Sequence, residues 1–336
     1  MAVNGRHPMW GIALILLMAA CFATLDTAVK YLGATVPVLL ILWGRYVFQA
    51  VAMTLWLAGR GLRGAGPGAF RAARPGFQVL RGALLLSTSG LSFYGVQHMP
   101  VAEFTAIAML TPVVVTVLAA TVLKEHVSGL RWALVALGLA GALLVIRPGT
   151  GVVGWAAVFP LALTVAYGAF QVLTSRYAAL EDPYITHFYT GLVGAVALSA
   201  IVAISPLRLV DALSGASALQ WSVLLLVGAM GTVGHLLLIL ALGMAPASTL
   251  MPFTYSALVF ATLAGAWVFG HMPDGIAMAG MAVIALGGAA SVWLNVREAQ
   301  QRSPAPASPT TAPAGAAQAS HERPGVSPVA MDVLGD

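Results

Sequence analysis

Two charged residues stand inside long apolar stretches of this sequence. Arg45 lies nine residues into the stretch 36–58, and Asp26 lies about five residues from the end of the stretch 9–31. A guanidinium binds carboxylates and phosphates through paired hydrogen bonds, and a carboxylate can balance that charge. Arg45 is therefore a candidate binding residue for an anionic or zwitterionic solute, with Asp26 as an exchangeable partner. A fixed Asp26–Arg45 ion pair that joins two helices is the alternative interpretation.

Other polar side chains mark further positions in the apolar stretches. They can donate hydrogen bonds to a solute in a cavity, or they can join one helix to another. The candidates are Thr111, Tyr167, Gln171, His187, Tyr189, His235 and Tyr255. The chain has a single cysteine, Cys21, and no pair of histidines with the spacing of a zinc motif. We therefore expect no metal site and no cofactor.

The composition shows what surrounds these side chains. Of 336 residues, 60% are hydrophobic and only 8% are charged, whereas soluble domains carry about 25% charged residues. A chain with so few charged residues cannot form a polar surface around this much apolar material in water. We therefore expect a lipid bilayer to surround it. The fold class we predict is an all-α integral membrane protein. The 36 glycines agree with this class, because small residues let membrane helices approach closely.

Ten apolar stretches are about 20 residues long, the length that crosses about 30 Å of hydrocarbon. They cover approximately residues 9–31, 36–58, 77–97, 101–123, 130–147, 153–175, 183–205, 220–243, 247–268 and 275–295. Residues 299–336 are rich in Pro, Ala, Ser and Thr. We expect a disordered cytoplasmic tail there, because this segment can bury little apolar surface.

The positions of lysine and arginine predict how these spans are oriented. With a cytoplasmic N-terminus, twelve basic residues fall on the cytoplasmic side, and only Lys30, Arg147 and Arg208 fall on the other. We expect a multi-pass protein of the bacterial inner membrane with both termini cytoplasmic. Arg81, near the start of the third span, should extend towards lipid headgroups. The net charge of +5 reflects this topology, and we expect no nucleic-acid partner.

The sequence repeats itself at an offset of 146 residues. This offset aligns more than a hundred residues without a gap, and it places Pro37 on Pro183 and Pro100 on Pro246. Each half holds five spans. Because five is an odd number, the second half enters the membrane in the opposite direction. Such inverted repeats supply two near-equivalent arrangements, which is the structural basis of alternating access in secondary transporters.

Two prolines fall inside equivalent spans of the two halves, Pro112 in the fourth and Pro252 in the ninth. Proline removes a backbone donor and frees a carbonyl one turn earlier. Interruptions in corresponding helices indicate a binding site between the repeats, and a simple packing kink is the alternative. Glu103, at the outer start of the fourth span, is either a proton-coupling carboxylate or an interfacial charge.

Segments at the ends of the spans and within the fourth span resemble a known family. The matching segments are Met99-Pro100-Val101-Ala102, Thr111-Pro112, Lys124-Glu125 and Ala245-Pro246-Ala247. Together they are similar to the EamA domain of the drug/metabolite transporter superfamily, and the resemblance covers about 9–295. It implies a first EamA repeat over 9–147 and a second over 153–295. His271 departs from the pattern, because such repeats often carry an acidic residue there.

The function that the resemblance and the buried charge favour is secondary-active transport of small metabolites. Anionic, zwitterionic or amino-acid-like solutes fit Arg45 best. The expected partners are a small-molecule substrate and the bilayer; a coupling ion or proton and a homodimer are left open. One alternative is an intramembrane hydrolase that uses Ser89 with His187 or His235. The other is a membrane scaffold without transport activity.

Overall fold

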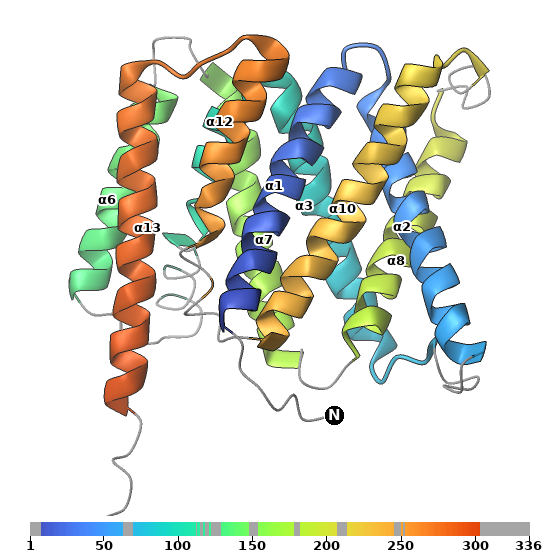
Figure 1. Cartoon of the computed structure of the whole chain (residues 1–336), viewed down its shortest axis with the longest axis horizontal. Helices are drawn as coiled ribbons and strands as arrows, with labels where there is room; N and C mark the ends of the chain where they lie inside the picture. The colour runs from blue at the N-terminus through green and yellow to red at the C-terminus, as the bar shows by residue number, and fades with distance from the viewer. Residues whose placement is uncertain are drawn as a thin grey trace, which may run out of the picture.

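The computed structural model describes residues 8–62, 70–111, 113–114, 117, 121, 129–147, 154–177, 182–206, 214–244, 250 and 253–302. These residues form a bundle of α-helices (Figure 1), and no strand occurs among them.

The first half contributes α1 (Pro8–Leu32), α2 (Val38–Arg60), α3 (Pro75–His98), α4 (Val101–Ala108) and α6 (Gly129–Ile146). The second half begins with the short 3-10 helix η3 (Gly154–Ala157). It continues with α7 (Val158–Tyr177), α8 (Pro183–Ile204), α10 (Ala218–Met244), α12 (Ser256–Phe269) and α13 (Gly275–Arg302).

Local sequence explains where several helices begin and end. Pro75 and Pro183 occupy the first turns of α3 and α8, where the missing N–H of proline is not needed. The Asp182 carboxylate caps α8 by accepting from Tyr184 N at 2.8 Å, which satisfies a free backbone donor. Gly270 ends α12 at φ 65°, a left-handed conformation that favours glycine.

Most of the predicted spans coincide with apolar helices. Five helices of the described residues are long and apolar enough to cross a membrane, namely α1, α2, α3, α8 and α10. Shorter apolar helices cover Trp132–Ile146, Gly154–Phe170, Ser256–Phe269 and Gly275–Ser291. Of the predicted span 101–123, the structure describes α4 and a few residues beyond it. Ten membrane crossings therefore stay a prediction.

The two halves run in opposite directions. In Figure 1, α1 rises from the end of the bundle where α13 finishes, whereas α7, the first long helix of the second half, descends towards that end. We call the end that holds Pro8 and Arg302 the terminal end, and the end that holds Leu32 the far end. Because α1 begins and α13 ends there, the described chain starts and finishes at the terminal end.

The helix packing follows an approximate two-fold relation. The most extensive contacts that pair a helix with its own counterpart are α2 with α8 and α6 with α13. The packing of α1 on α10 is matched by that of α7 on α3, and the packing of α1 on α12 by that of α7 on α4. Exchanging the halves leaves this set of contacts unchanged, as expected for an inverted repeat.

The fourth and ninth spans are interrupted at equivalent positions. Helix α4 ends at Ala108 and is followed by a turn at Met109, whereas α12 begins at Ser256 after a turn at Tyr255. The offset of 146 residues places Met109 on Tyr255. The prolines expected to cause these breaks, Pro112 and Pro252, lie outside the described residues, as do Lys124 and Glu125.

Helix α13 extends further than expected. It continues to Arg302, four residues into the tail predicted for 299–336. Residues 303–336 lie outside the part of the chain that the structure describes.

Glycines bring α8 close to α2. A Cβ on Gly194 would overlap the ring of Tyr46, and a Cβ on Gly191 would lie 2.9 Å from Cγ of Gln49. The offset of 146 residues places Arg45 on Gly191, so the two halves differ in charge at this position. The close approach puts polar side chains of α2 against the start of α8.

Candidate functional site

Arg45 is buried where helices of both halves meet. The residue is 1% exposed. Its Nη1 donates to Ser89 Oγ of α3 at 3.1 Å, and its guanidinium lies 4.6 Å from the ring centre of Tyr46. On the side of α10, Nη2 lies 3.5 Å from Nδ1 of His235. Its buried Nε has no hydrogen-bond partner.

Arg45 has no carboxylate partner among the described residues. The ion pairs of this part of the chain join Arg60 to Asp182, Arg147 to Asp274 and His271 to Glu103. Removing a charge from water costs several kcal/mol unless an opposite charge or hydrogen bonds compensate it. The position therefore favours an anionic group beside the guanidinium.

Although Arg45 and His235 lie close together, His235 does not accept a hydrogen bond from Arg45. Nδ1 of His235 also lies 2.9 Å from the carbonyl oxygen of Gly231. A carbonyl only accepts, so Nδ1 must carry a proton and donate to it. The same nitrogen then has no lone pair for Arg45, and Nη2 keeps its donors for another acceptor.

A second set of hydrogen bonds joins α2, α8 and α10 next to Arg45. Nε2 of His187 lies 3.2 Å from the carbonyl oxygen of Thr232 and must donate to it. Nδ1 of His187 then accepts from Nε2 of Gln49 at 3.3 Å, and that amide also donates to the His187 carbonyl at 3.0 Å. His187 is thus held in one neutral tautomer, with its ring 6.3 Å from that of His235. We call Arg45, Gln49, Ser89, His187 and His235 the Arg45 cluster.

Arg81 also points into the protein, so the expectation that it reaches lipid headgroups is wrong. The residue is 5% exposed, and Nη1 donates to Thr190 Oγ1 of α8 at 2.8 Å. Its guanidinium lies 4.7 Å from the ring centre of Phe170 on α7. The rotation of α3, which the sequence alone does not specify, turns Arg81 towards α8.

Asp26 binds α3 instead of Arg45. Its Oδ1 accepts from Ser92 Oγ at 3.0 Å, and Ser92 lies one helical turn after Ser89. The direct Asp26–Arg45 ion pair is absent from the described residues. Asp26 and Arg45 thus approach the same face of α3 from two different helices.

The other predicted candidates lie apart from the cluster. Thr111 donates to the carbonyl of Ala108 at 2.8 Å, and Tyr189 donates to the carbonyl of Phe70 at 3.0 Å near the terminal end. Tyr255 is buried at the break before α12, where a Cβ on Gly288 would overlap its hydroxyl. Tyr167 stacks on Phe170 at 5.7 Å. The side chain of Gln171 is outside what the structure describes.

Sequence reasoning did not assign several buried polar residues to this site. Gln49, Arg81, Ser89, Thr190 and Thr232 are all buried or nearly so. One signal could have found Gln49, because it follows Arg45 by four residues and must share its helix face. Nothing local indicates that Arg81 and Thr190 meet, because they are 109 residues apart.

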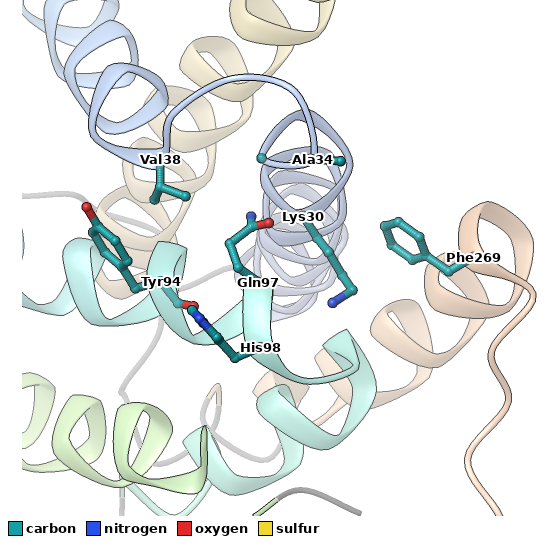
Figure 2. Close-up of a pocket in the computed structure, with 8 residues that line it drawn as sticks. Lys30, Ala34, Val38, Tyr94, Gln97, His98 and Phe269 are labelled. Carbon is teal, nitrogen blue, oxygen red and sulfur yellow. The ribbon is translucent and has the colours of Figure 1, made fainter. Parts of the chain in front are cut away.

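The bundle is hollow at the far end. A cavity of about 550 Å³ is lined by Lys30, Gly33, Ala34, Val38, Tyr94, Gln97, His98 and Phe269. Figure 2 shows the Lys30 side chain extending from α1 between Gln97 and Phe269. Its Nζ donates to the carbonyls of Val96 and Met99 at 2.7 and 3.0 Å.

The terminal end is closed between α2 and α8. Arg60 pairs with Asp182 at 3.4 Å, and Trp56 stacks on Tyr184 with ring centres 5.9 Å apart. Next to them, Phe70 packs edge-on against Phe188. The Arg45 cluster lies between this closed end and the hollow far end.

A family model describing the EamA-like transporter family matches this chain twice, over residues 9–147 and 154–293. The chain belongs to the EamA-like transporter family. It is therefore a multi-pass membrane protein that transports small metabolites, and it is not an enzyme. In the structure, the Ser89 hydroxyl contacts Arg45 and Tyr46.

Relatives of this transporter act on different metabolites. It is 22% identical over 277 residues to the S-adenosylmethionine uptake transporter of Rickettsia prowazekii (strain Madrid E), covering 82% of this chain and 89% of the relative. It is 29% identical over 195 residues to a riboflavin transporter of Rhizobium johnstonii, covering 56% of this chain and 61% of the relative. A solved crystal structure shares its fold, with a TM-score of 0.59, 19% identity and coverage of 86% of this chain and 97% of the other.

Proposed function

We propose that this EamA-family protein carries a small metabolite with a carboxylate or phosphate group across the bacterial inner membrane by alternating access. The observation that carries the proposal is Arg45, which is 1% exposed, has an unpaired Nε and lacks an acidic partner among the described residues. A solute anion would complete the hydrogen bonds of Nε and Nη2.

The position of Arg45 supports a transport role for this charge. It belongs to α2 of the first half, contacts α3 of the same half, and faces α10 of the second half. A solute bound there touches both halves, so their relative movement changes its surroundings. S-adenosylmethionine, the solute of the Rickettsia relative, has a zwitterionic amino-acid end that an arginine of this kind can bind.

The architecture supports alternating access. The packing of the halves keeps its pattern when they are exchanged, which allows a second arrangement with the openings reversed. In the present arrangement, the Arg60–Asp182 pair and its aromatic neighbours close one end, while the cavity at Lys30 hollows the other. In this proposal, ten membrane spans form two repeats, 9–147 and 153–295, which move relative to each other.

The distribution of basic residues supports the orientation. Arg60, Arg74 and Arg297 lie towards the terminal end, whereas Lys30 and Arg147 lie at the far end. Under the positive-inside rule the terminal end is cytoplasmic. Both termini are then cytoplasmic, followed by the tail 299–336, and the cavity faces outwards.

Mass spectrometry of metabolites in cells and in medium tests this proposal. Cells that overexpress the wild type are compared with cells that express Arg45→Leu and Arg147→Gln at matched membrane levels. Arg147 is a suitable control because it is bound to Asp274 at the far end, away from the cluster. We expect the wild type and Arg147→Gln to shift the same anionic or zwitterionic metabolites, and Arg45→Leu to shift none. Equal shifts with Arg45→Leu would overturn the role of this charge.

A further inference from the structure

A second buried ionisable group, Glu103, lies at the contact between the halves near the far end. It belongs to the first turn of α4 and is 3% exposed. Its Oε1 lies 3.0 Å from Nε2 of His271, in the loop between α12 and α13. Its Oε2 is buried and has no hydrogen-bond partner.

Because Oε2 is buried and unpaired, the ionised form of Glu103 is costly in free energy. A buried carboxylate that is ionised loses its hydration, and one good hydrogen bond restores only part of it. The protonated acid avoids most of this cost. The His271 contact holds in both states, because Nε2 donates to an ionised carboxylate and accepts from a protonated one.

We infer that Glu103 and His271 together bind the coupling proton of this transporter, an inference that rests on the proposed transport function. The pair takes one proton from water at the far end. Its net charge changes from −1 to zero, and the hydrogen bond between Oε1 and Nε2 is kept. No other reactant is needed.

His271 supplies the route by which the proton reaches Glu103. Its side chain is 43% exposed, whereas that of Glu103 is 4% exposed. A hollow of about 190 Å³ runs beside the pair, lined by Lys30, Pro100, Val101, Ala102, Gly265, Phe269 and His271. Lys30 and Phe269 also line the larger cavity of Figure 2. An exposed imidazole next to a buried carboxylate is suited to pass a proton inwards.

The charges around Glu103 come from few elements. Lys30 of α1 interacts with it electrostatically while donating to the end of α3. Of the other groups at this end, His98 of α3 contacts the carbonyl of Tyr94, and Arg147 pairs with Asp274 at 2.7 Å. The described residues of α7 and α12 add no charge here. Protonation of Glu103 therefore leaves Lys30 without its nearby anion.

This location links the proton to the movement of the halves. Glu103 belongs to the first half and His271 to the second, and α4 packs against α12. Both helices are broken, at Met109 and at Tyr255. An arrangement that separates α4 from the loop at His271 changes the affinity for the proton, so proton binding and the balance between the two arrangements are coupled.

Infrared difference spectroscopy of the full chain in lipid nanodiscs tests whether Glu103 binds a proton. The wild type is compared with Glu103→Gln, an isosteric change, and with His271→Gln. Asp274→Asn is the matched control, since it removes a neighbouring but exposed carboxylate. We expect acidification to produce a protonated-carboxyl band in the wild type and in Asp274→Asn that is missing from Glu103→Gln, while the bands of the other carboxyl groups remain. His271→Gln should move the pH at which the band grows. A band unchanged by Glu103→Gln overturns the inference.

A cysteine at the cavity tests whether this proton controls the arrangement. Tyr94→Cys is placed in a Cys21→Ser background, and its labelling by a membrane-impermeant maleimide is normalised at each pH to the unfolded protein. We expect the normalised rate to depend on pH, and Glu103→Gln to remove that dependence. An unaltered pH profile in Glu103→Gln contradicts the inference. If metabolite profiling succeeds while both of these results are negative, the inference fails and the proposed function stands.

Discussion

Arg45 and Asp26 are held by two serines one helical turn apart on α3, Ser89 at 3.1 Å and Ser92 at 3.0 Å, and not by each other. This arrangement keeps an anion close to Arg45 without saturating its guanidinium. Asp26 interacts electrostatically with the buried charge of Arg45. The Nε and Nη2 atoms of Arg45 stay available to a solute. Under the proposed function, this separation leaves Arg45 able to bind a substrate anion inside the membrane.

Ser89→Ala should weaken solute binding without abolishing transport. The hydroxyl anchors one nitrogen of Arg45 and contacts the hydroxyl of Tyr46 at 3.0 Å. Loss of one such hydrogen bond costs about 1 kcal/mol, which raises KM about fivefold. Concentration-dependent uptake into cells measures this change, with Ser87→Ala as the control, because Ser87 is exposed and bonds within its own helix. Complete loss of activity in a folded Ser89→Ala protein would contradict a positioning role.

Gly194→Leu should destabilise the protein, because the ring of Tyr46 occupies the space that the new side chain needs. Overpacking of this kind costs about 1–3 kcal/mol. Thermal unfolding in detergent should show a lower midpoint. Gly59→Leu serves as the control, since a Cβ on Gly59 meets no atom within 4 Å. Equal midpoints for the two variants would show that α2 and α8 are less closely packed than described.

Arg60→Gln should loosen the terminal end. Its ion pair with Asp182 is partly exposed, so it contributes at most about 1 kcal/mol. We expect Phe188→Cys, in a Cys21→Ser background, to be labelled up to about fivefold faster when Arg60 is replaced. Arg147→Gln at the far end should leave that rate unchanged. An increase with Arg147→Gln equal to that with Arg60→Gln would indicate general loosening of the bundle.

Asp274→Asn should remove a pH-dependent part of the stability. The backbone N–H of Ala277 and the Arg147 guanidinium lower the pKa of the Asp274 carboxyl from its usual value. A lowered pKa stabilises the folded state above the unfolded value of about 3.9, and that stabilisation is lost as the pH falls. The wild type should therefore melt above Asp274→Asn at neutral pH, and the difference should shrink on acidification. A difference that grows on acidification would reverse the sign of this argument.

Much of the fold could be predicted from the sequence, because membrane helices leave a strong periodic and compositional signal. The offset of 146 residues indicated the two-fold packing, and the depth of Arg45 in its span indicated its burial. The direction in which each helix turns its polar side chains, and the residues that these side chains contact, could not be predicted in the same way. Whether Arg81 turns to lipid or to Thr190 depends on the rotation of α3, and the Glu103–His271 contact joins residues 168 positions apart. Only the packed structure brings such residues together.

The most direct test of the account is uptake by purified protein in proteoliposomes. The probe is the isotope-labelled metabolite whose pool overexpression shifts, and wild type, Arg45→Gln and Arg147→Gln are compared at equal protein density. A hydrogen-bonded charge contributes about 1.5–3 kcal/mol, so we predict that Arg45→Gln loses at least about tenfold in kcat/KM while Arg147→Gln keeps the wild-type value. Wild-type uptake by a folded Arg45→Gln protein would contradict the claim that this buried guanidinium binds the transported solute.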